Sequence, residues 1–315
     1  MEATNNFYSS EQGSYPPKPV LIEQRSSTVS RSMISLFIYA LLFYFLFDRN
    51  IAYIAAVLLV LLVHEFGHFF AMKFYGYQNI KLFIIPLLGA YVSGKKQMVS
   101  QRQMNIIILS GPIPGLAFGF ILYFLNKTWH NESVKMLANV FLYLNLFNLL
   151  PIYPLDGGRF LENLFLKNNY GIRLVFTILS VLFLLSLIFI TGNLLMAIIP
   201  AAMILELYNE IRNQKIRDYL DQEKIEYRSD YALLPDKSYW LIRDCILFSF
   251  QKKYAGVQPG IYQYSPFEPV IMQHIISVLK TKYLDDMGLL AKIFFLLIFL
   301  FFLIGIPFLS YLLFF

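Results

Sequence analysis

Five consecutive residues inside an otherwise apolar stretch are suited to metal chemistry. The sequence HEFGH occupies positions 64–68, and residues i and i+4 of an α-helix lie on the same face. His64 and His68 could therefore bind one zinc ion, and Glu65 could take a proton from the metal-bound water. Imidazoles that hydrogen-bond within a helix interface without a metal are the alternative. Two histidines and a glutamate inside a membrane need partners, which favours the metal.

A catalytic zinc ion takes three protein ligands and leaves one position open for water, so a third ligand is needed. Asp156 is favoured, because Pro151 and Pro154 break the preceding helix and the two following glycines permit a sharp turn back into the bundle. An ordinary Asp-Gly-Gly turn at the membrane surface is the alternative. A divalent metal and the carboxylates of Asp156 and Glu65 sum to zero charge, which favours a ligand. Four other candidates are interpreted as surface or interfacial residues: His130, His274, Glu162 and Glu206.

The composition identifies the environment of these residues. Of the 315 residues, 57% are hydrophobic and only 15% are charged, whereas soluble domains carry about 25% charged residues. These values exclude a soluble enzyme and a disordered chain, and they indicate an integral membrane protein in contact with the lipid bilayer. The net charge of +6 is explained by basic cytoplasmic loops, and no nucleic-acid partner is expected. The single cysteine, Cys245, excludes an internal disulfide and a thiolate zinc site.

Apolar runs of about 20 residues predict transmembrane helices. We predict an all-α polytopic membrane protein with about seven transmembrane helices and a small cytoplasmic domain. The predicted spans are 33–47, 51–75, 104–125, 136–152, two within 173–207 that divide at Thr191-Gly192-Asn193, and 289–315. The predicted domains are a loose polar cytoplasmic tail (1–32), a transmembrane core that contains the candidate metal ligands (33–207), a cytoplasmic block of unknown role (208–288) and a C-terminal transmembrane helix (289–315).

The distribution of basic residues predicts the orientation of the chain. Loops after the first, third and fifth spans hold few lysines and arginines, and the opposite side holds most of them. Because basic residues gather on the cytoplasmic side, we expect a cytoplasmic N-terminus. The membrane we expect is the plasma membrane. His64, His68 and Asp156 would then share one depth, in the cytoplasmic third of the membrane.

Two motifs together resemble a known family, the site-2 proteases, which are zinc metalloproteases that cut within the membrane. The resemblance rests on HEFGH at 64–68 and on NLLPIYPLDGG at 148–158. It implies that the transmembrane core (33–207) is a metalloprotease core, in which His64, His68 and Asp156 bind zinc and Glu65 is the general base.

The resemblance also implies that Asn148 holds the substrate backbone. An amide inside a membrane is unfavourable, and polar residues there usually serve a site. An interhelical hydrogen bond is the alternative for Asn148, and Asn145 and Asn139 could make bonds of the same kind.

The third predicted span departs from the family pattern. Many family members have a Gly-Pro pair followed by two residues and an asparagine, but here Gly115 occupies the asparagine position of the run Gly111-Pro112-Ile113-Pro114-Gly115. The contribution of that amide is either missing or supplied by another residue. Gly111, Gly115 and Gly119 are spaced by four residues, which predicts close helix packing.

The segment from Lys81 to Val92 is apolar but too short to span a membrane. It resembles the membrane-entering hairpin of site-2 proteases, whose edge can pair with an extended substrate. The resemblance therefore implies a short membrane-re-entrant β-hairpin in addition to the transmembrane helices. An interfacial loop without that role is the alternative.

These features together predict a zinc-dependent endopeptidase. Its expected substrates are transmembrane segments that unwind locally, because an intact helix satisfies its own backbone hydrogen bonds. The resemblance implies single-span membrane proteins that another protease has already cut, or remnant signal peptides. The alternatives are a metal-binding membrane scaffold or transporter without proteolytic activity, and a membrane-anchored zinc peptidase that acts on soluble chains.

Overall fold

The computed structural model describes residues 15–21, 50–85, 89–166, 169–192 and 197–309. The chain forms two compact units. The smaller unit comprises Met1–Gln24 and Asn209–Lys282, and the larger comprises Arg25–Tyr208 and Tyr283–Phe315.

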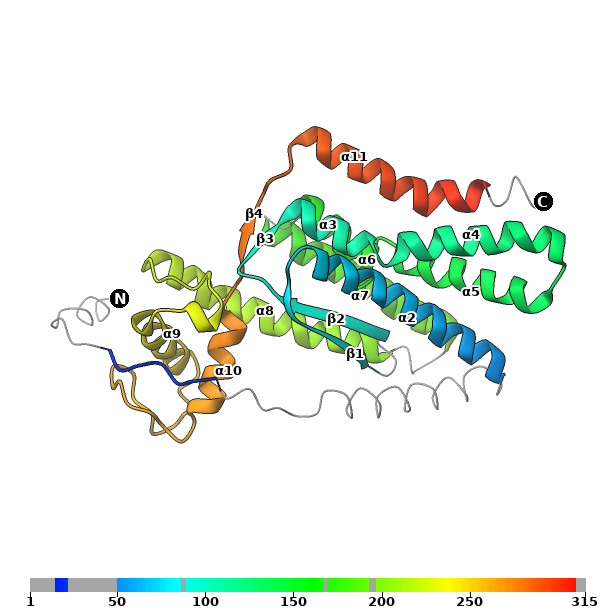
Figure 1. The fold of residues 1–315 in the computed structure, drawn as a ribbon. Helices are drawn as coiled ribbons and strands as arrows, with labels where there is room; N and C mark the ends of the chain where they lie inside the picture. The colour runs from blue at the N-terminus through cyan, green and yellow to red at the C-terminus, as the bar shows by residue number, and fades with distance from the viewer. Residues whose placement is uncertain (1–14, 22–49, 86–88, 167–168, 193–196, 310–315) are drawn as a thin grey trace. The chain divides into compact units, whose positions relative to one another are not determined.

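The larger unit is mainly helical (Figure 1). Its helices are α2 (Ile51–Phe74), α3 (Gln101–Leu109), α4 (Pro112–Trp129), α5 (Glu132–Asn148), α6 (Asp156–Leu161), the π-helix η1 (Glu162–Leu166), α7 (Tyr170–Thr191), the start of α8 (Ile198–Gln222), α11 (Leu289–Leu300) and the π-helix η4 (Phe301–Gly305). Its strands are β1 (Gln78–Ile85), β2 (Gly89–Lys95) and β3 (Met98–Ser100), and β3 pairs with β4 (Lys282–Leu284).

Capping residues set the ends of the helices that build the site. The side chain of Asn50 accepts a hydrogen bond from the backbone N–H of Tyr53 and starts α2. Asn131 caps α5 in the same way. Gly192 ends α7 in the left-handed conformation, at φ 67°, which a glycine adopts without strain. This end coincides with the predicted break between the fifth and sixth spans.

Four helical segments are long and apolar enough to cross a membrane: Ile51–Phe74, Gln101–Trp129, Tyr170–Thr191 and Leu289–Leu309. They agree with the second, third, fifth and seventh predicted spans, and they support a polytopic membrane protein. The fourth and sixth predicted spans are helical, as α5 and α8, but are not among the four. The first lies outside the described residues.

Helix α8 crosses the predicted boundary at residue 208, and the two compact units divide between Tyr208 and Asn209 within this helix. It continues to Gln222 through the sequence that begins the predicted cytoplasmic block. The change in hydropathy at this point does not end the helix, because backbone hydrogen bonding is independent of side-chain polarity.

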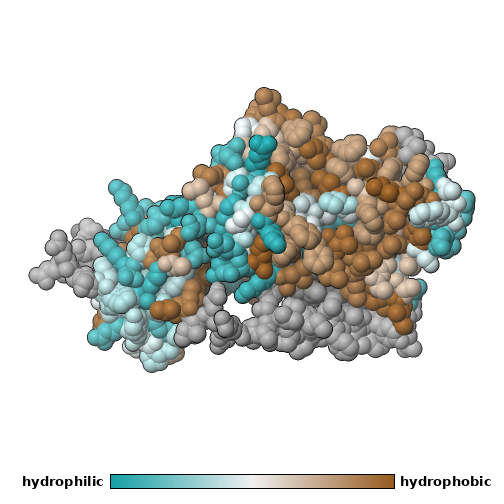
Figure 2. Space-filling view, viewed as in Figure 1, coloured by the Kyte–Doolittle hydropathy of each residue, from teal (hydrophilic) through white to brown (hydrophobic). Residues whose placement is uncertain are grey.

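The surface of the larger unit fits a lipid environment. Hydrophobic side chains cover much of the face over α4, α5 and α11 in Figure 2. Phe118, Phe124, Leu290 and Phe294 are each at least half exposed. Exposed apolar surface of this extent is unfavourable in water and suits a bilayer.

Strands β1 and β2 form an antiparallel hairpin over the segment that was predicted to contain one. Leu82 pairs with Val92, and the register is irregular between Gln78 and Lys81. The hairpin packs against α2, and Figure 1 shows the two strands beside that helix. Entry of this hairpin into the membrane remains a prediction.

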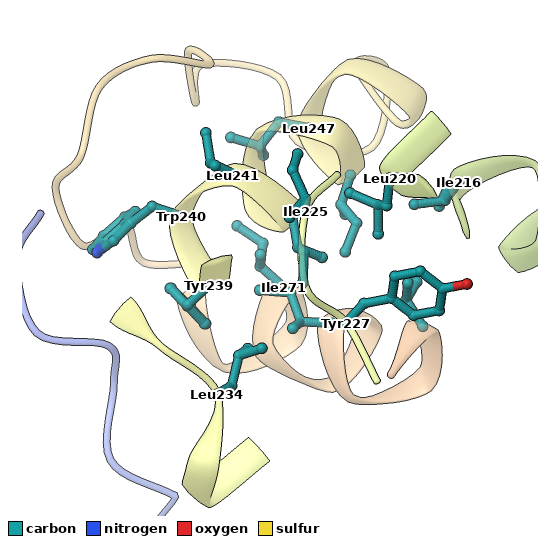
Figure 3. Close-up of a cluster of buried hydrophobic side chains, with 14 of the residues drawn as sticks. Ile216, Leu220, Ile225, Tyr227, Leu234, Tyr239, Trp240, Leu241, Leu247 and Ile271 are labelled. Carbon is teal, nitrogen blue, oxygen red and sulfur yellow. The ribbon is translucent and has the colours of Figure 1, made fainter. Parts of the chain in front are cut away.

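The smaller unit has its own hydrophobic core, shown in Figure 3. The helices around it are the end of α8, the short 3-10 helix η3 (Tyr231–Leu233), α9 (Asp236–Ser249) and α10 (Glu268–Val278). A buried ion pair joins α9 to α10, with Arg243 Nε 3.0 Å from Glu268 Oε1. The Tyr239 hydroxyl donates a hydrogen bond to the same carboxylate.

Residues 15–21 differ from the expectation of a loose tail. They form an ordered segment without helix or strand that packs on the smaller unit. Trp240 donates a hydrogen bond to the backbone oxygen of Pro16, and Tyr231 donates one to that of Pro19. The composition suggests disorder, but these aromatic partners lie more than 200 positions away in the sequence.

Candidate metal centre

Three predicted ligands come together in the larger unit. His64 and His68 lie one turn apart on α2, and Asp156 is the first residue of α6. His64 Nε2 and His68 Nε2 lie 2.9 and 3.2 Å from Asp156 Oδ2. The two nitrogens are 3.2 Å apart. The structure therefore brings together one atom of each residue into a group that could hold a metal ion.

The hydrogen bond made by Nδ1 of each histidine determines which ring nitrogen carries the proton. His64 Nδ1 lies 2.8 Å from the amide oxygen of Asn145, and His68 Nδ1 lies 2.8 Å from the backbone oxygen of Ile107. Both oxygens can only accept, so both Nδ1 atoms carry a proton. In the neutral imidazoles, both Nε2 atoms then present lone pairs toward the Asp156 carboxylate. A cation among these three atoms removes the repulsion between them.

The spacing of the three atoms suits zinc. Tetrahedral ligands at about 2.0 to 2.1 Å from zinc lie about 3.3 Å from one another. The observed separations of 2.9 to 3.2 Å are close to this value. Two imidazole nitrogens and one carboxylate oxygen are also a donor set of catalytic zinc sites, with one position left for water. The residues present therefore fit the metal that the sequence predicts.

Asn145 is a site residue that the sequence analysis did not select. Its side chain is fully buried, and its Nδ2 donates a hydrogen bond to the Phe141 backbone oxygen, which leaves Oδ1 directed at His64. Such partners orient a ligand imidazole and raise its basicity. Asn145 does make an interhelical hydrogen bond, as considered above, but the partner is a candidate metal ligand. Its polarity within an apolar helix was the available signal.

Gly115 explains how the Asn145 amide fits. A Cβ atom at position 115 would lie 2.3 to 2.5 Å from three atoms of that amide. A side chain at position 115 would therefore overlap the amide of Asn145, and glycine leaves that space open. At Gly119, a Cβ would come within 2.8 Å of Phe141. Close packing of α4 on α5 is therefore confirmed for these two glycines.

Gly111 has a different neighbour from the other two glycines. A Cβ atom there would lie 2.3 Å from His68 Nε2 and 2.9 Å from His64 Nε2. The junction between α3 and α4 thus forms part of the wall of the site. Ser110, the preceding residue, lies 3.1 Å through its hydroxyl from the backbone oxygen of Gly67. The α3 end and the HEFGH turn are in direct contact.

The loop between α5 and α6 holds Asp156 in position. The backbone N–H of Tyr153 donates a hydrogen bond to the Ser180 hydroxyl, and the Tyr153 hydroxyl donates one to Glu206. A Cβ on Gly157 would lie 2.0 Å from the Leu149 backbone oxygen. This glycine therefore lets α6 start against the end of α5, which brings the Asp156 carboxylate to α2.

The remaining predicted residues take different places. Glu65 is buried on α2, next to His64. Asn148 is partly buried at the last position of α5. The four candidates set aside by sequence lie outside the metal group: His130 ends α4, His274 lies in the smaller unit, Glu162 pairs with Arg173, and Glu206 binds Tyr153.

Comparison with known proteins agrees with the motifs. Residues 52–132 match the family model of Peptidase family M50, a range that contains HEFGH and ends before Asp156. Stage IV sporulation protein FB of Bacillus subtilis is 28% identical over 113 residues, which is 35% of this chain and 39% of that protein. Zinc metalloprotease MJ0392 of Methanocaldococcus jannaschii is 31% identical over 126 residues, which is 37% of this chain and 36% of that protein.

The chain thus spans a little over a third of the length of these curated relatives. A solved structure, the site-2 protease from Methanocaldococcus jannaschii, matches with a TM-score of 0.44 and 20% identity, over 56% of this chain and 87% of that one. The family model and the curated relatives confirm the resemblance to the site-2 proteases that the two motifs indicate.

Proposed function

We propose that this protein is an intramembrane zinc metalloprotease that hydrolyses peptide bonds in locally unwound transmembrane segments. The observation that carries the proposal is the group of His64, His68 and Asp156, on and beside a helix that is long and apolar enough to cross a membrane. The matches to a peptidase family and to a zinc metalloprotease support it.

The chain's own residues have separate roles in this proposal. His64, His68 and Asp156 hold zinc, which supplies Lewis-acid polarisation of the scissile carbonyl and lowers the pKa of a bound water toward 7. Glu65 takes the proton of the attacking water and later delivers it to the leaving amine. Asn145 keeps the Nδ1 proton of His64 in place, so that Nε2 is available as a ligand.

Substrate is held in extended form, because a scissile peptide inside a helix is inaccessible. Asn148 donates a hydrogen bond to the substrate backbone, and the edge of the β1–β2 hairpin pairs with the unwound strand. The substrates are transmembrane proteins, with single-span proteins already cut by another protease and remnant signal peptides as the favoured classes. The N-terminus is cytoplasmic, the chain lies in the plasma membrane, and residues 208–288 are a cytoplasmic block.

Cleavage of a model substrate tests the activity. The purified full chain is mixed in detergent with a single-span substrate whose transmembrane helix carries a helix-breaking Asn-Pro pair, and products are mapped by mass spectrometry. The native chain should cut within the span, and Glu65→Gln should reduce the rate by at least about a hundredfold. Glu132→Gln, at an exposed acidic residue of α5, is the matched control and should cut normally. Equal cleavage by Glu65→Gln, or none by the native chain, would contradict the proposal.

A further inference from the structure

The N-terminal segment 15–21 has the sequence Tyr-Pro-Pro-Lys-Pro-Val-Leu. Each proline ring fixes its own φ, and a residue before a proline is restricted to extended or polyproline II conformations. These two constraints cover the positions from Tyr15 to Pro19. The segment is therefore predisposed to polyproline II, a helix with three residues per turn and no internal hydrogen bonds.

The burial of the segment follows the same period of three. Pro17 and Val20 are exposed, and the five other residues are partly buried. A polyproline II helix that lies in a groove presents every third residue to solvent. One edge of the segment thus faces outward along its whole length, and the other two edges face the smaller unit.

Aromatic side chains donate hydrogen bonds to the backbone oxygens of the segment. Trp240 Nε1 lies 2.7 Å from the Pro16 oxygen, and the Tyr264 hydroxyl lies 2.6 Å from the Pro17 oxygen. The Tyr231 hydroxyl lies 2.7 Å from the Pro19 oxygen. Successive proline carbonyls are thus each bound by one aromatic side chain. Aromatic grooves with such donors are a general means of recognising proline-rich peptides.

The lysine in the middle of the segment has its own subsite. The Lys18 backbone N–H donates to Asp236 Oδ1 at 2.9 Å, and the ammonium group donates to the backbone oxygens of Ala232 and Leu234. The ammonium also lies 5.5 Å from the centre of the Tyr231 ring. A cationic residue is therefore bound specifically between the prolines.

Two of the three aromatic donors belong to a hydrophobic core in which the segment has no buried residue. All sixteen buried residues of this core come from positions 216–278, and Figure 3 draws fourteen of them. Tyr15 and Leu21 are only partly buried and pack against this core. Trp240, which lies next to the segment in Figure 3, is supported by the guanidinium of Arg243, 5.0 Å from its ring, and by the stacked ring of Tyr264. The donors are thus held in place by the unit itself.

From these contacts we infer that the smaller unit is a binding module for proline-rich peptides in the polyproline II conformation, and that Tyr15–Leu21 is its ligand in cis. The ligand class is an aromatic residue followed by Pro-Pro-Lys-Pro. Proline-rich segments of this chemistry in other chains would compete with the resident segment for the groove.

Release and rebinding of the segment test the inference. A protease site inserted between Gln24 and Arg25 lets the full chain fold with the segment bound and then frees it by cleavage. A fluorescent peptide of residues 13–23 is titrated against the cut and washed chain and against the uncut chain. The cut chain should bind it saturably, and the uncut chain at least about tenfold more weakly, because the tethered segment competes.

Variants test the contacts that the structure shows. In the cut chain, Tyr264→Phe keeps the ring and removes one donor, which should weaken peptide binding about fivefold. Tyr219→Phe, at a partly exposed tyrosine of α8 in the same unit, is the matched control and should bind normally. A peptide with alanine in place of its three prolines should bind at least about tenfold more weakly, and one with Val20→Ser should bind like the native peptide.

Three results would overturn the inference. The first is a segment that stays bound after cleavage and dilution, or whose loss unfolds the unit by circular dichroism and hydrogen exchange, because it would then be a structural strut. The second is a folded cut chain that does not bind the peptide. The third is equal binding by the cut and uncut chains, which would place the segment outside the groove in solution.

Discussion

Removal of the Asn145 side chain should weaken zinc binding without removing a ligand. In Asn145→Ala, the buried Nδ1–H of His64 loses its acceptor, which lies 2.8 Å away in the native chain. Loss of such a partner of a ligand histidine typically lowers metal affinity 10- to 100-fold, equivalent to about 1.4 to 2.7 kcal/mol. The expected result is an increase of the zinc Kd by that factor, with one zinc still bound at saturation.

A competition titration with a metallochromic chelator measures this Kd on the full chain in detergent. Visible spectra of the cobalt-substituted protein report the ligand geometry independently of activity. Asn139→Ala is the matched control, because Asn139 lies earlier on the same helix and outside the metal group. A Kd for Asn145→Ala within twofold of the native value would refute the role of Asn145.

A second substitution tests whether the site needs an amide or this particular asparagine. A Cβ at position 115 would fall among the atoms of the Asn145 amide, so a side chain there can reach the same space once Asn145 is truncated. Gly115→Asn should therefore recover at least about fivefold in zinc affinity in the Asn145→Ala background. In the native background the same change should weaken binding, because two amides compete for one space. No recovery in the double variant would show that the two positions are not equivalent.

Three further predictions concern packing and titration. Gly111→Ala places a methyl group 2.3 Å from an imidazole nitrogen of the site, so the zinc content should fall at least about tenfold. The control Gly171→Ala should leave the zinc content unchanged, because its Cβ would be 3.5 Å from its nearest neighbour. Equal zinc content in both variants would contradict the packing at Gly111. Burial, and then two neighbouring cations, lower the pKa of His274 from 6.5. The unfolded unit therefore binds the proton more tightly, and the stability of the folded unit falls as the pH decreases below about 6.5. This loss of stability, measured by hydrogen exchange, should be smaller in His274→Gln, and identical pH profiles of the two chains would refute the prediction. Burial raises the pKa of the Cys245 thiol to about 12, so iodoacetamide at pH 8 should modify it only after unfolding, and fast modification of the native chain would contradict this.

The features that depend on local sequence could be predicted. The spacing of His64 and His68 places both on one face of any helix, and the prolines and glycines around Asp156 predict a break where α6 begins. The fold class follows from composition, because a chain with 57% hydrophobic residues must bury them in its core or place them in a lipid bilayer. These arguments need no knowledge of tertiary packing.

The features that depend on packing could not be predicted. Asn139, Asn145 and Asn148 all lie in one apolar stretch, and only the packing of α5 against α2 decides which of them meets His64. The docking of the segment at 15–21 joins parts of the chain more than 200 positions apart. The end of α8 could not be predicted from hydropathy, because a helix can continue after its sequence has become polar.

The zinc stoichiometry of three purified chains tests the metal centre most directly. Native chain, Glu65→Gln and Asp156→Ala are equilibrated with zinc, washed free of excess metal, and analysed by inductively coupled plasma mass spectrometry. If His64, His68 and Asp156 are the ligands and Glu65 is the base, native chain and Glu65→Gln should retain one zinc per chain and Asp156→Ala should lose most of it. Full zinc retention by Asp156→Ala, or loss of zinc in Glu65→Gln, would contradict the assignment.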